Sequence, residues 1–266
     1  MNEAPDSAVT PRAIPQDRLL GDVRQWLEKG GYALEMRVAL SLRKRTNLLA
    51  QGYTYKDPAT GLEREADVWG AILVNSKDPL HSIDIFIECK QTDAPWIGFK
   101  SHGGLNGPIS FWDYYDDECA VCSGVEHSLH AFLAPIPEAY AITEKRSREK
   151  QGRQGSRDLA YEAVQQAANA FLASRVDIDE IQGHPADSRV VSGPTLAIVV
   201  TTSPIVVASL DGGGELVLEE TDSLKVLVPR QGLGDSEGVE VLVVNLDALE
   251  ATLDALATLG ARQPRD

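Results

Sequence analysis

Over residues 82–90 an apolar side chain occupies every second position, which is the pattern of a β-strand. One face of this strand carries the apolar side chains of Ile83, Ile85, Ile87 and Cys89. The opposite face carries Asp84, Phe86, Glu88 and Lys90. The pattern therefore predicts a strand that presents a carboxylate and an amine side by side.

A second strand is predicted over residues 65–72, where Ala66 and Val68 face away from Asp67. Residues 75–79 contain Asn, Ser, Asp and Pro, which favour a turn, so the two strands would form an antiparallel hairpin. This hairpin is expected to bring Asp67 toward Glu88.

Residues 32–42 have the spacing of an amphipathic helix. Glu35 shares a face with Val38 and Leu42, so a carboxylate points where apolar side chains point. Burying an unpaired charge costs several kcal/mol, so a glutamate in this position needs a partner. The expected partner is a divalent cation shared with Asp67 and Glu88.

The rest of the chain predicts one α/β unit with a mixed sheet flanked by helices. A helix capped by Asp17 comes first, and a β-branched run at 194–208 suits a strand covered on both faces. Residues 91–135, rich in Gly, Pro, Trp and acidic groups, are expected to be an irregular insertion. The other expected elements are strands at 51–56, 139–143 and 239–245 and helices at 157–174 and 246–259.

A single domain is expected over residues 17–260, with a strand–helix extension at 211–260 and tails at 1–16 and 261–266. The first tail is rich in Pro and lacks an apolar core, so it is expected to be disordered and not a signal peptide. No run approaches the ~18 apolar residues that cross a bilayer, so no membrane partner is expected. With 43% hydrophobic and 24% charged residues the composition is that of a globular protein, and only three cysteines favour the cytoplasm.

A helix with Glu35, a strand with Asp67 and a strand ending in Glu88-Cys89-Lys90 resemble, in this order, the PD-(D/E)xK nuclease superfamily. The run from Arg64 to Val68 is also similar to the Arg-Glu-hydrophobic-Asp-Val segment of such proteins, although no Pro precedes Asp67. The resemblance implies a restriction-endonuclease-like core, in which helices flank a mixed β-sheet.

The same resemblance implies a metal-dependent nuclease that hydrolyses phosphodiester bonds, of DNA rather than RNA, with Mg²⁺ or Mn²⁺. Asp67 and Glu88 would bind the ion through oxygen atoms, and Glu35 would add a ligand directly, through water or to a second ion. Lys90 would orient or deprotonate the attacking water, or stabilise the pentacovalent phosphate. The alternative is a nuclease-like module without cleavage activity that binds nucleic acid or a partner protein. A homodimer is expected if the protein cuts both strands of a duplex.

A simpler alternative for the acidic residues is a surface ion pair of Glu88 with Lys90, beside an unrelated Asp67. Glu35 on an apolar helix face does not fit that alternative. Glu65 shares the strand face of Asp67, and it is either a supporting ligand or the partner of a neighbouring cation, Arg64 or Lys56.

The net charge of −15 opposes nucleic-acid binding, so local basic clusters decide whether phosphates can be held. One cluster is a candidate phosphate clamp, or else a solvated surface, and comprises Arg146, Arg148, Lys150 and Arg153. Trp96 is either a platform for a nucleic-acid base or a filler of the core.

Cys119, Cys122, His127 and His130 are the residue types of a structural zinc site. All four lie within 12 residues, and the two histidines are closer in sequence than in most zinc sites. Structural Zn²⁺ is therefore a second metal hypothesis, and buried thiols with satisfied histidines are its alternative.

Overall fold

The computed structural model describes residues 16–73, 80–100, 120–145, 158–181, 190–229 and 238–259. These residues form two β-sheets and several helices. The predicted α/β class, with helices on a mixed sheet, is confirmed.

The larger sheet, sheet A, combines antiparallel and parallel strand pairs. In spatial order its strands are β1 (Leu49–Lys56), β2 (Glu63–Leu73), β3 (Leu80–Lys90), β7 (Val190–Thr201), β11 (Gly238–Asn245), β10 (Ser223–Pro229) and β5 (Glu138–Ala139). β1, β2 and β3 form an antiparallel meander, whereas β3, β7 and β11 run parallel. The predicted antiparallel pairing of the strands that carry Asp67 and Glu88 is confirmed.

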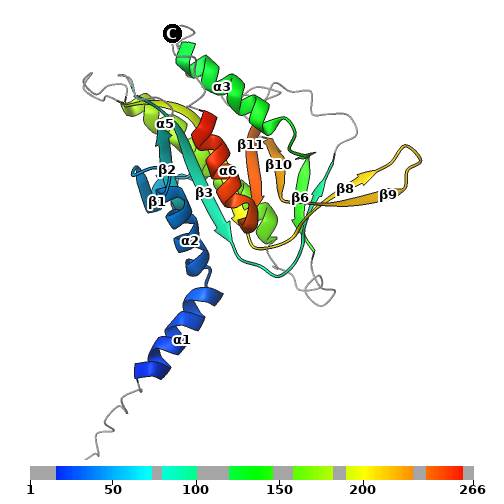
Figure 1. The fold of residues 1–266 in the computed structure, drawn as a ribbon, viewed down its shortest axis with the longest axis horizontal. Helices are drawn as coiled ribbons and strands as arrows, with labels where there is room; N and C mark the ends of the chain where they lie inside the picture. The colour runs from blue at the N-terminus through cyan, green and yellow to red at the C-terminus, as the bar shows by residue number, and fades with distance from the viewer. Residues whose placement is uncertain are drawn as a thin grey trace, which may run out of the picture.

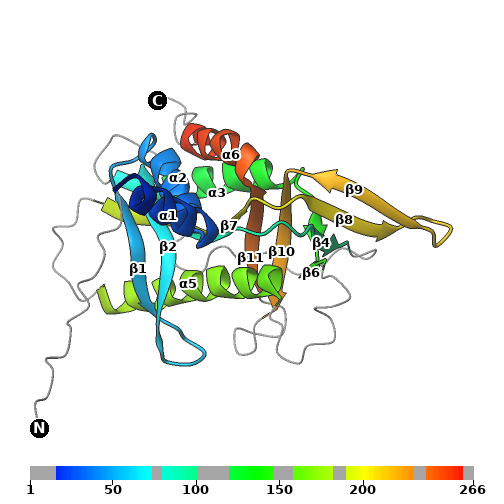
Figure 2. The ribbon, with the colours of Figure 1, turned by 90° about the horizontal axis from the view of Figure 1, so that it is seen from below.

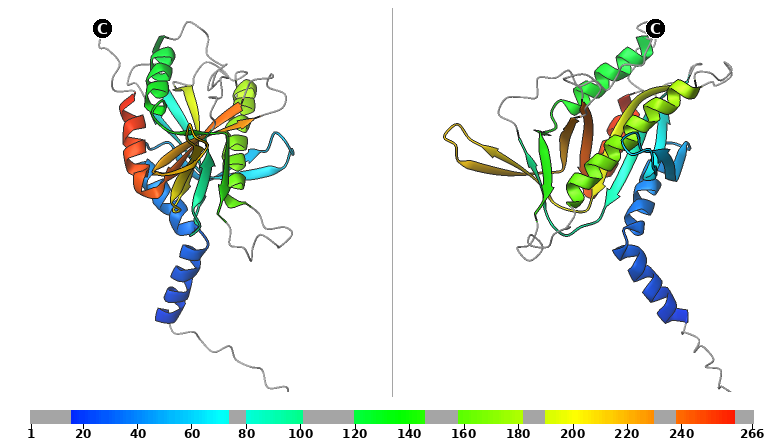
Figure 3. Two further views of the ribbon diagram at one scale, coloured as in Figure 1. Left: turned by 90° about the vertical axis from the view of Figure 1, so that its right-hand side faces the viewer. Right: turned by 180° about the vertical axis from the view of Figure 1, so that it is seen from behind.

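Helices cover both faces of sheet A, as Figures 2 and 3 show. One face packs against α2 (Tyr32–Arg43), α3 (Ala120–Leu133) and α6 (Leu246–Leu259), and the other against α5 (Leu159–Ile181). The α2 side is filled by branched side chains, among them Leu34, Ile87 and Leu253, none of which is exposed. The first helix, α1 (Gln16–Lys29), projects away from this body (Figure 1). No helix of the described residues is long and apolar enough to cross a membrane.

The smaller sheet, sheet B, contains β6 (Ala141–Glu144), β4 (Trp96–Phe99), β8 (Ile205–Leu210) and β9 (Leu216–Thr221), in this spatial order. β3 leads into β4 and β7 leads into β8, so two parallel neighbours in sheet A become parallel neighbours in sheet B. Two hydrogen bonds join the segments where the chain crosses between the sheets. Ser203 Oγ donates to the Thr92 carbonyl at 2.7 Å, and the Trp96 N–H donates to the Pro204 carbonyl at 2.9 Å.

Some expectations about the organisation of the chain are wrong. Residues 91–135 contain β4 and α3 and are therefore not irregular throughout. The β-branched run at 194–208 is not one strand, because residues 202–204 separate β7 from β8. The residues after 211 do not merely extend the core, since β10 and β11 belong to sheet A.

Candidate functional site

β2 and β3 part from each other in the middle of sheet A. Their ladder runs from the pair Leu73–Ser82 to the pair Val68–Ile87 and stops there. Beyond that point β2 stays paired with β1 as far as Glu63, and β3 stays paired with β7 as far as Lys90. The strands therefore diverge, and we call this opening the fork. Asp67 and Glu88 are the first residues on its two arms.

The alternation of β2 is interrupted at the fork. Val68 packs with Val38 and Ile87 on the α2 side of the sheet, whereas Ala66 packs with Phe86 on the α5 side. The prediction that Ala66 and Val68 share a face is therefore wrong. Asp67 lies where the strand changes face, which a strict two-residue period cannot represent.

Asp67 bridges the two arms of the fork. Its Oδ2 accepts a hydrogen bond of 2.6 Å from the backbone N–H of Cys89. That N–H lies beyond the end of the β2–β3 ladder, so the carboxylate replaces the missing strand partner. Burial raises the pKa of Asp67, although the Cys89 hydrogen bond and the Lys90 charge act in the opposite direction.

Glu88 and Lys90 form a buried ion pair on the other arm. Glu88 is 4% exposed, and its Oε1 lies 2.5 Å from Lys90 Nζ. Burial, and then repulsion from Asp67, raises the pKa of Glu88 to about 7 against the attraction of Lys90. Burial alone would lower the pKa of Lys90, but the neighbouring acids, Glu88 first and then Asp67, help to outweigh it and the pKa is raised. Lys90 is therefore a cation here and is poorly suited to be a general base.

Glu35 approaches the fork from α2. This helix begins after Gly31, whose φ of 85° lies in the left-handed region that glycine adopts without strain. It packs on the sheet through Leu34, Val38 and Leu42. Glu35 is half-buried on this helix. Burial raises the pKa of Glu35, Asp67 raises it further and Lys90 lowers it. Because Glu35 in turn raises the pKa of Glu88, the predicted set behaves as one electrostatic cluster.

The end of α2 is tied to α6, which holds Glu35 in place relative to the sheet. Arg45 is only 8% exposed, and its guanidinium donates to the carbonyl oxygens of Ser41 and Glu250, at 2.7 and 3.0 Å. Its Nη2 also lies 2.5 Å from Asp254 Oδ1. These bonds depend on the planar guanidinium group with its several N–H donors, which a lysine cannot reproduce.

The alternative of a surface ion pair beside an unrelated Asp67 is wrong for this structure. Glu88 is buried, and the Asp67 charge acts on it directly. Glu65, in contrast, is closer to the cluster than the sequence suggested. Its charge raises the pKa of both Glu35 and Asp67, whereas its expected partner Arg64 lies 3.6 Å from a carboxylate oxygen of Asp57.

The remaining predicted site residues lie elsewhere. Trp96 is fully buried in the core next to α5, so it fills the core and offers no face to a base. His127 and His130 are exposed on α3. The other predicted groups fall outside the described residues or side chains: Cys119, Cys122, Arg146, Arg148, Lys150 and Arg153.

Within the described parts of the chain, no three His, Cys, Asp or Glu side chains are grouped closely enough to hold a metal ion. Glu35, Asp67 and Glu88 are thus electrostatically coupled without forming a closed shell of three ligands. Two carboxylates still suit Mg²⁺, because proteins usually bind this ion through one or two carboxylates, water and substrate phosphates. Asp67 and Glu88 fit that chemistry.

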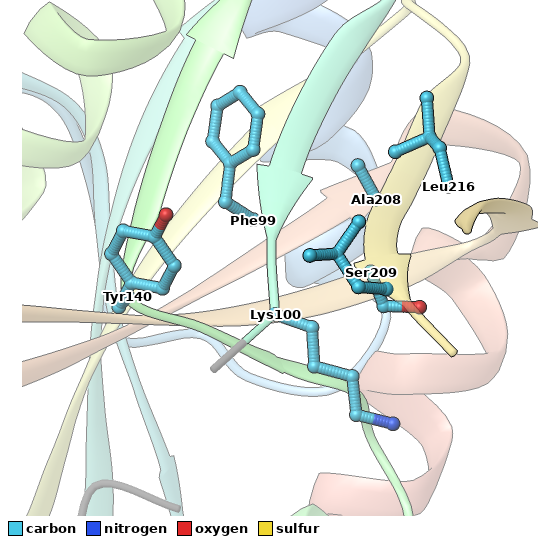
Figure 4. Close-up of a pocket in the computed structure, with 7 residues that line it drawn as sticks. Phe99, Lys100, Tyr140, Ala208, Ser209 and Leu216 are labelled. Carbon is cyan, nitrogen blue, oxygen red and sulfur yellow. The ribbon is translucent and has the colours of Figure 1, made fainter. Parts of the chain in front are cut away.

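A cavity of about 300 Å³ lies on sheet B, and the fork residues do not line it. Figure 4 shows the aromatic rings of Phe99 and Tyr140 and the amine of Lys100 around it. The other lining residues are Ala208, Ser209, Leu210 and Leu216. Its mainly apolar lining offers no carboxylate for acid–base or metal chemistry.

Comparisons of the chain with protein-family models, with curated proteins and with solved structures found no match.

Proposed function

We propose that this protein is a metal-dependent nuclease with a restriction-endonuclease-like core, and that it hydrolyses phosphodiester bonds of DNA in preference to RNA. The observation that carries this proposal is the fork. Asp67 and Glu88 are there the first residues beyond the last pair of β2 with β3, and Lys90 pairs with Glu88. Sheet A supports it as well, because an antiparallel meander is followed by a strand parallel to β3.

The electrostatics of the fork favour a cation. The Asp67 charge raises the pKa of both Glu35 and Glu88, and the Glu35 charge raises that of Glu88 further, so the fold holds acids together at an electrostatic cost. Such clusters of perturbed acids concentrate at functional sites, and a divalent ion relieves their repulsion. Asp67 and Glu88 would hold Mg²⁺ or Mn²⁺, and Glu35 would act through a bound water. When bound, the ion neutralises charge on the phosphate and lowers the pKa of a water molecule.

Lys90 has a distinct part in this mechanism. Its raised pKa keeps the amine protonated, so it would neutralise a phosphoryl oxygen or orient the attacking water. Glu88 anchors this amine at 2.5 Å and thereby fixes its direction before substrate binds. Asp67 is anchored in the same way by the Cys89 N–H. Both charges are preorganised, which lowers the cost of reaching the transition state.

The test is cleavage of plasmid DNA by the purified full chain with Mg²⁺ or Mn²⁺. The wild type should nick the plasmid, and Glu88→Gln and Lys90→Ala should abolish nicking. Glu63→Gln is a matched control, because this acid lies on β2 as well but is exposed. Its activity should equal that of the wild type.

The alternative function is a nuclease-like module that binds nucleic acid or a partner protein without cleaving. Absence of cleavage with every divalent ion tried, together with unchanged DNA binding in Glu88→Gln, would establish that alternative and refute the nuclease.

A further inference from the structure

α1 carries an apolar stripe that the described body of the protein leaves largely uncovered. Its apolar residues are Leu19, Leu20, Val23, Trp26 and Leu27, and all except the half-buried Leu27 are exposed. Trp26 is 61% exposed and Leu20 59%. At 100° per residue these positions share one side of the helix. A surface helix of a globular protein normally turns such a stripe to its core, so this one lacks a partner.

The apolar stripe continues onto α2. The ring of Trp26 stacks on that of Tyr32, with centroids 5.1 Å apart. Tyr32, Met36 and Leu40 follow at four-residue spacing, and each is between 45% and 62% exposed. The exposed side chains of both helices leave on the order of 700 Å² uncovered, and the larger part lies on α1, against the ~800 Å² that each partner contributes to a standard interface.

The spacing of the stripe on α1 is symmetric about Val23. Leu19 and Leu20 lie four and three residues before it, and Trp26 and Leu27 lie three and four residues after it. A two-fold interface requires a patch that is complementary to itself. When two such helices run antiparallel, Leu19 of one faces Leu27 of the other, and Leu20 faces Trp26.

Charge also favours a second copy of this chain as the partner. The chain has a net charge of −15, so two copies repel each other when their bodies approach. α1 itself has three acidic and three basic residues among its 14. It extends about 21 Å, more than twice the ~8 Å Debye length at physiological salt. A neutral helix that projects this far lets two acidic bodies associate at a screened distance.

We propose that α1 pairs antiparallel with α1 of a second copy, with the two-fold axis at Val23, and that this pairing makes the protein a homodimer. The pairing does not depend on the proposed nuclease activity. Because α2 follows α1 directly and carries Glu35, the dimer also relates two forks by the same axis.

The mass of the full chain in solution tests the dimer. Sedimentation equilibrium should give twice the chain mass for the wild type. Leu20→Glu and Trp26→Glu each place a charge in the interface, so each should weaken association by more than about ten-fold and yield monomer. Gln25→Glu adds the same charge on the opposite side of α1 and should leave the dimer intact. Circular dichroism checks that all three variants stay folded.

Engineered cysteines test the direction of pairing. Val23 lies on the proposed axis, so the cysteines of Val23→Cys in the two copies should face each other and form a disulfide. A disulfide requires Cα atoms ~4.4–6.8 Å apart, which only a position at the axis allows. Leu19→Cys should not, since in the antiparallel register its own copy lies about 12 Å along the helix. Gln25→Cys and the wild type, treated with the same oxidant, are the controls.

A monomeric wild type at every concentration would overturn the proposal, and so would a dimer that persists in both Leu20→Glu and Trp26→Glu. Cross-linking of Leu19→Cys would replace the antiparallel pairing by a parallel one. A monomer in which Trp26→Ala loses binding to a single-stranded oligonucleotide would show instead that the stripe stacks on nucleic acid.

Discussion

The backbone N–H of Cys89 and the carboxylate of Asp67 meet at 2.6 Å across the opening between β2 and β3. One side chain thereby satisfies a backbone donor of the next strand and also places a negative charge beside Glu88. The structural role of Asp67 needs only an acceptor oxygen, whereas its proposed chemical role needs the charge. Substitutions can therefore separate the two roles.

Asp67→Asn keeps an acceptor oxygen for Cys89 and removes the charge, so we expect a folded protein without nuclease activity. Asp67→Ala removes the acceptor as well and should lower the free energy of unfolding by about 1–3 kcal/mol. Urea denaturation of both variants measures the difference. Equal stability of the two would contradict a structural role for this hydrogen bond, and Glu63→Ala on the same strand controls for the loss of a carboxylate.

Glu88 should make stability depend on pH. Its pKa of about 7 in the folded protein exceeds the ordinary value of 4.5, so the folded state binds the proton more tightly. This contribution to stability is complete below pH 4.5 and is lost as pH rises to about 7. Relative to Glu88→Gln, the free energy of unfolding of the wild type should fall by up to about 3 kcal/mol between pH 4.5 and about 7. Unfolding curves at both pH values measure it, and a constant difference would refute the shift.

Metal binding should depend on the same protonation. Mg²⁺ or Mn²⁺ requires ionised carboxylates, so each pH unit below about 7 should lower the affinity by up to ~10-fold. Calorimetric titration of Mn²⁺ at several pH values gives the affinity and the protons released. Affinity that does not change with pH would show that Glu88 is not a ligand. Glu88→Gln should bind weakly at every pH.

A second buried charge cluster lies near the β5 edge of sheet A. Lys225 Nζ lies 3.8 Å from Glu240 and 3.9 Å from Glu138, and Glu240 is 6% exposed. Lys225→Met leaves Glu240 buried without its cation, so we expect the free energy of unfolding to fall by about 3–5 kcal/mol at pH 8. Burial raises the pKa of Glu240 to about 7, and its protonation at pH 5 should make the loss smaller.

Chemical denaturation at the two pH values measures this effect. The double variant Lys225→Met/Glu240→Gln should recover much of the stability, because it removes the stranded charge. A double variant as unstable as Lys225→Met would contradict the explanation.

Local patterns predicted the strands around Glu88 because both faces of β3 obey a two-residue period. The same patterns failed at Asp67, where the ladder ends and the strand changes face. β4 was missed because it has four residues and lies in a Gly- and Pro-rich range. Glu65 was underrated because its effect on Glu35 requires α2 to lie against the meander, and that long-range contact has no local signature.

The two hydrogen bonds between residues 92–96 and 203–204 have a mechanical consequence. The chain leaves sheet A at the ends of β3 and β7 and enters sheet B at the neighbouring strands β4 and β8. One sheet therefore cannot slide relative to the other without breaking these two hydrogen bonds. Lys90 is the last residue of β3 and lies just before these hydrogen bonds. They hold its strand in place although they take no part in the proposed chemistry. Because Lys90 pairs with Thr201 at the end of β7, a displacement of the β8–β9 hairpin would reach this amine through β7.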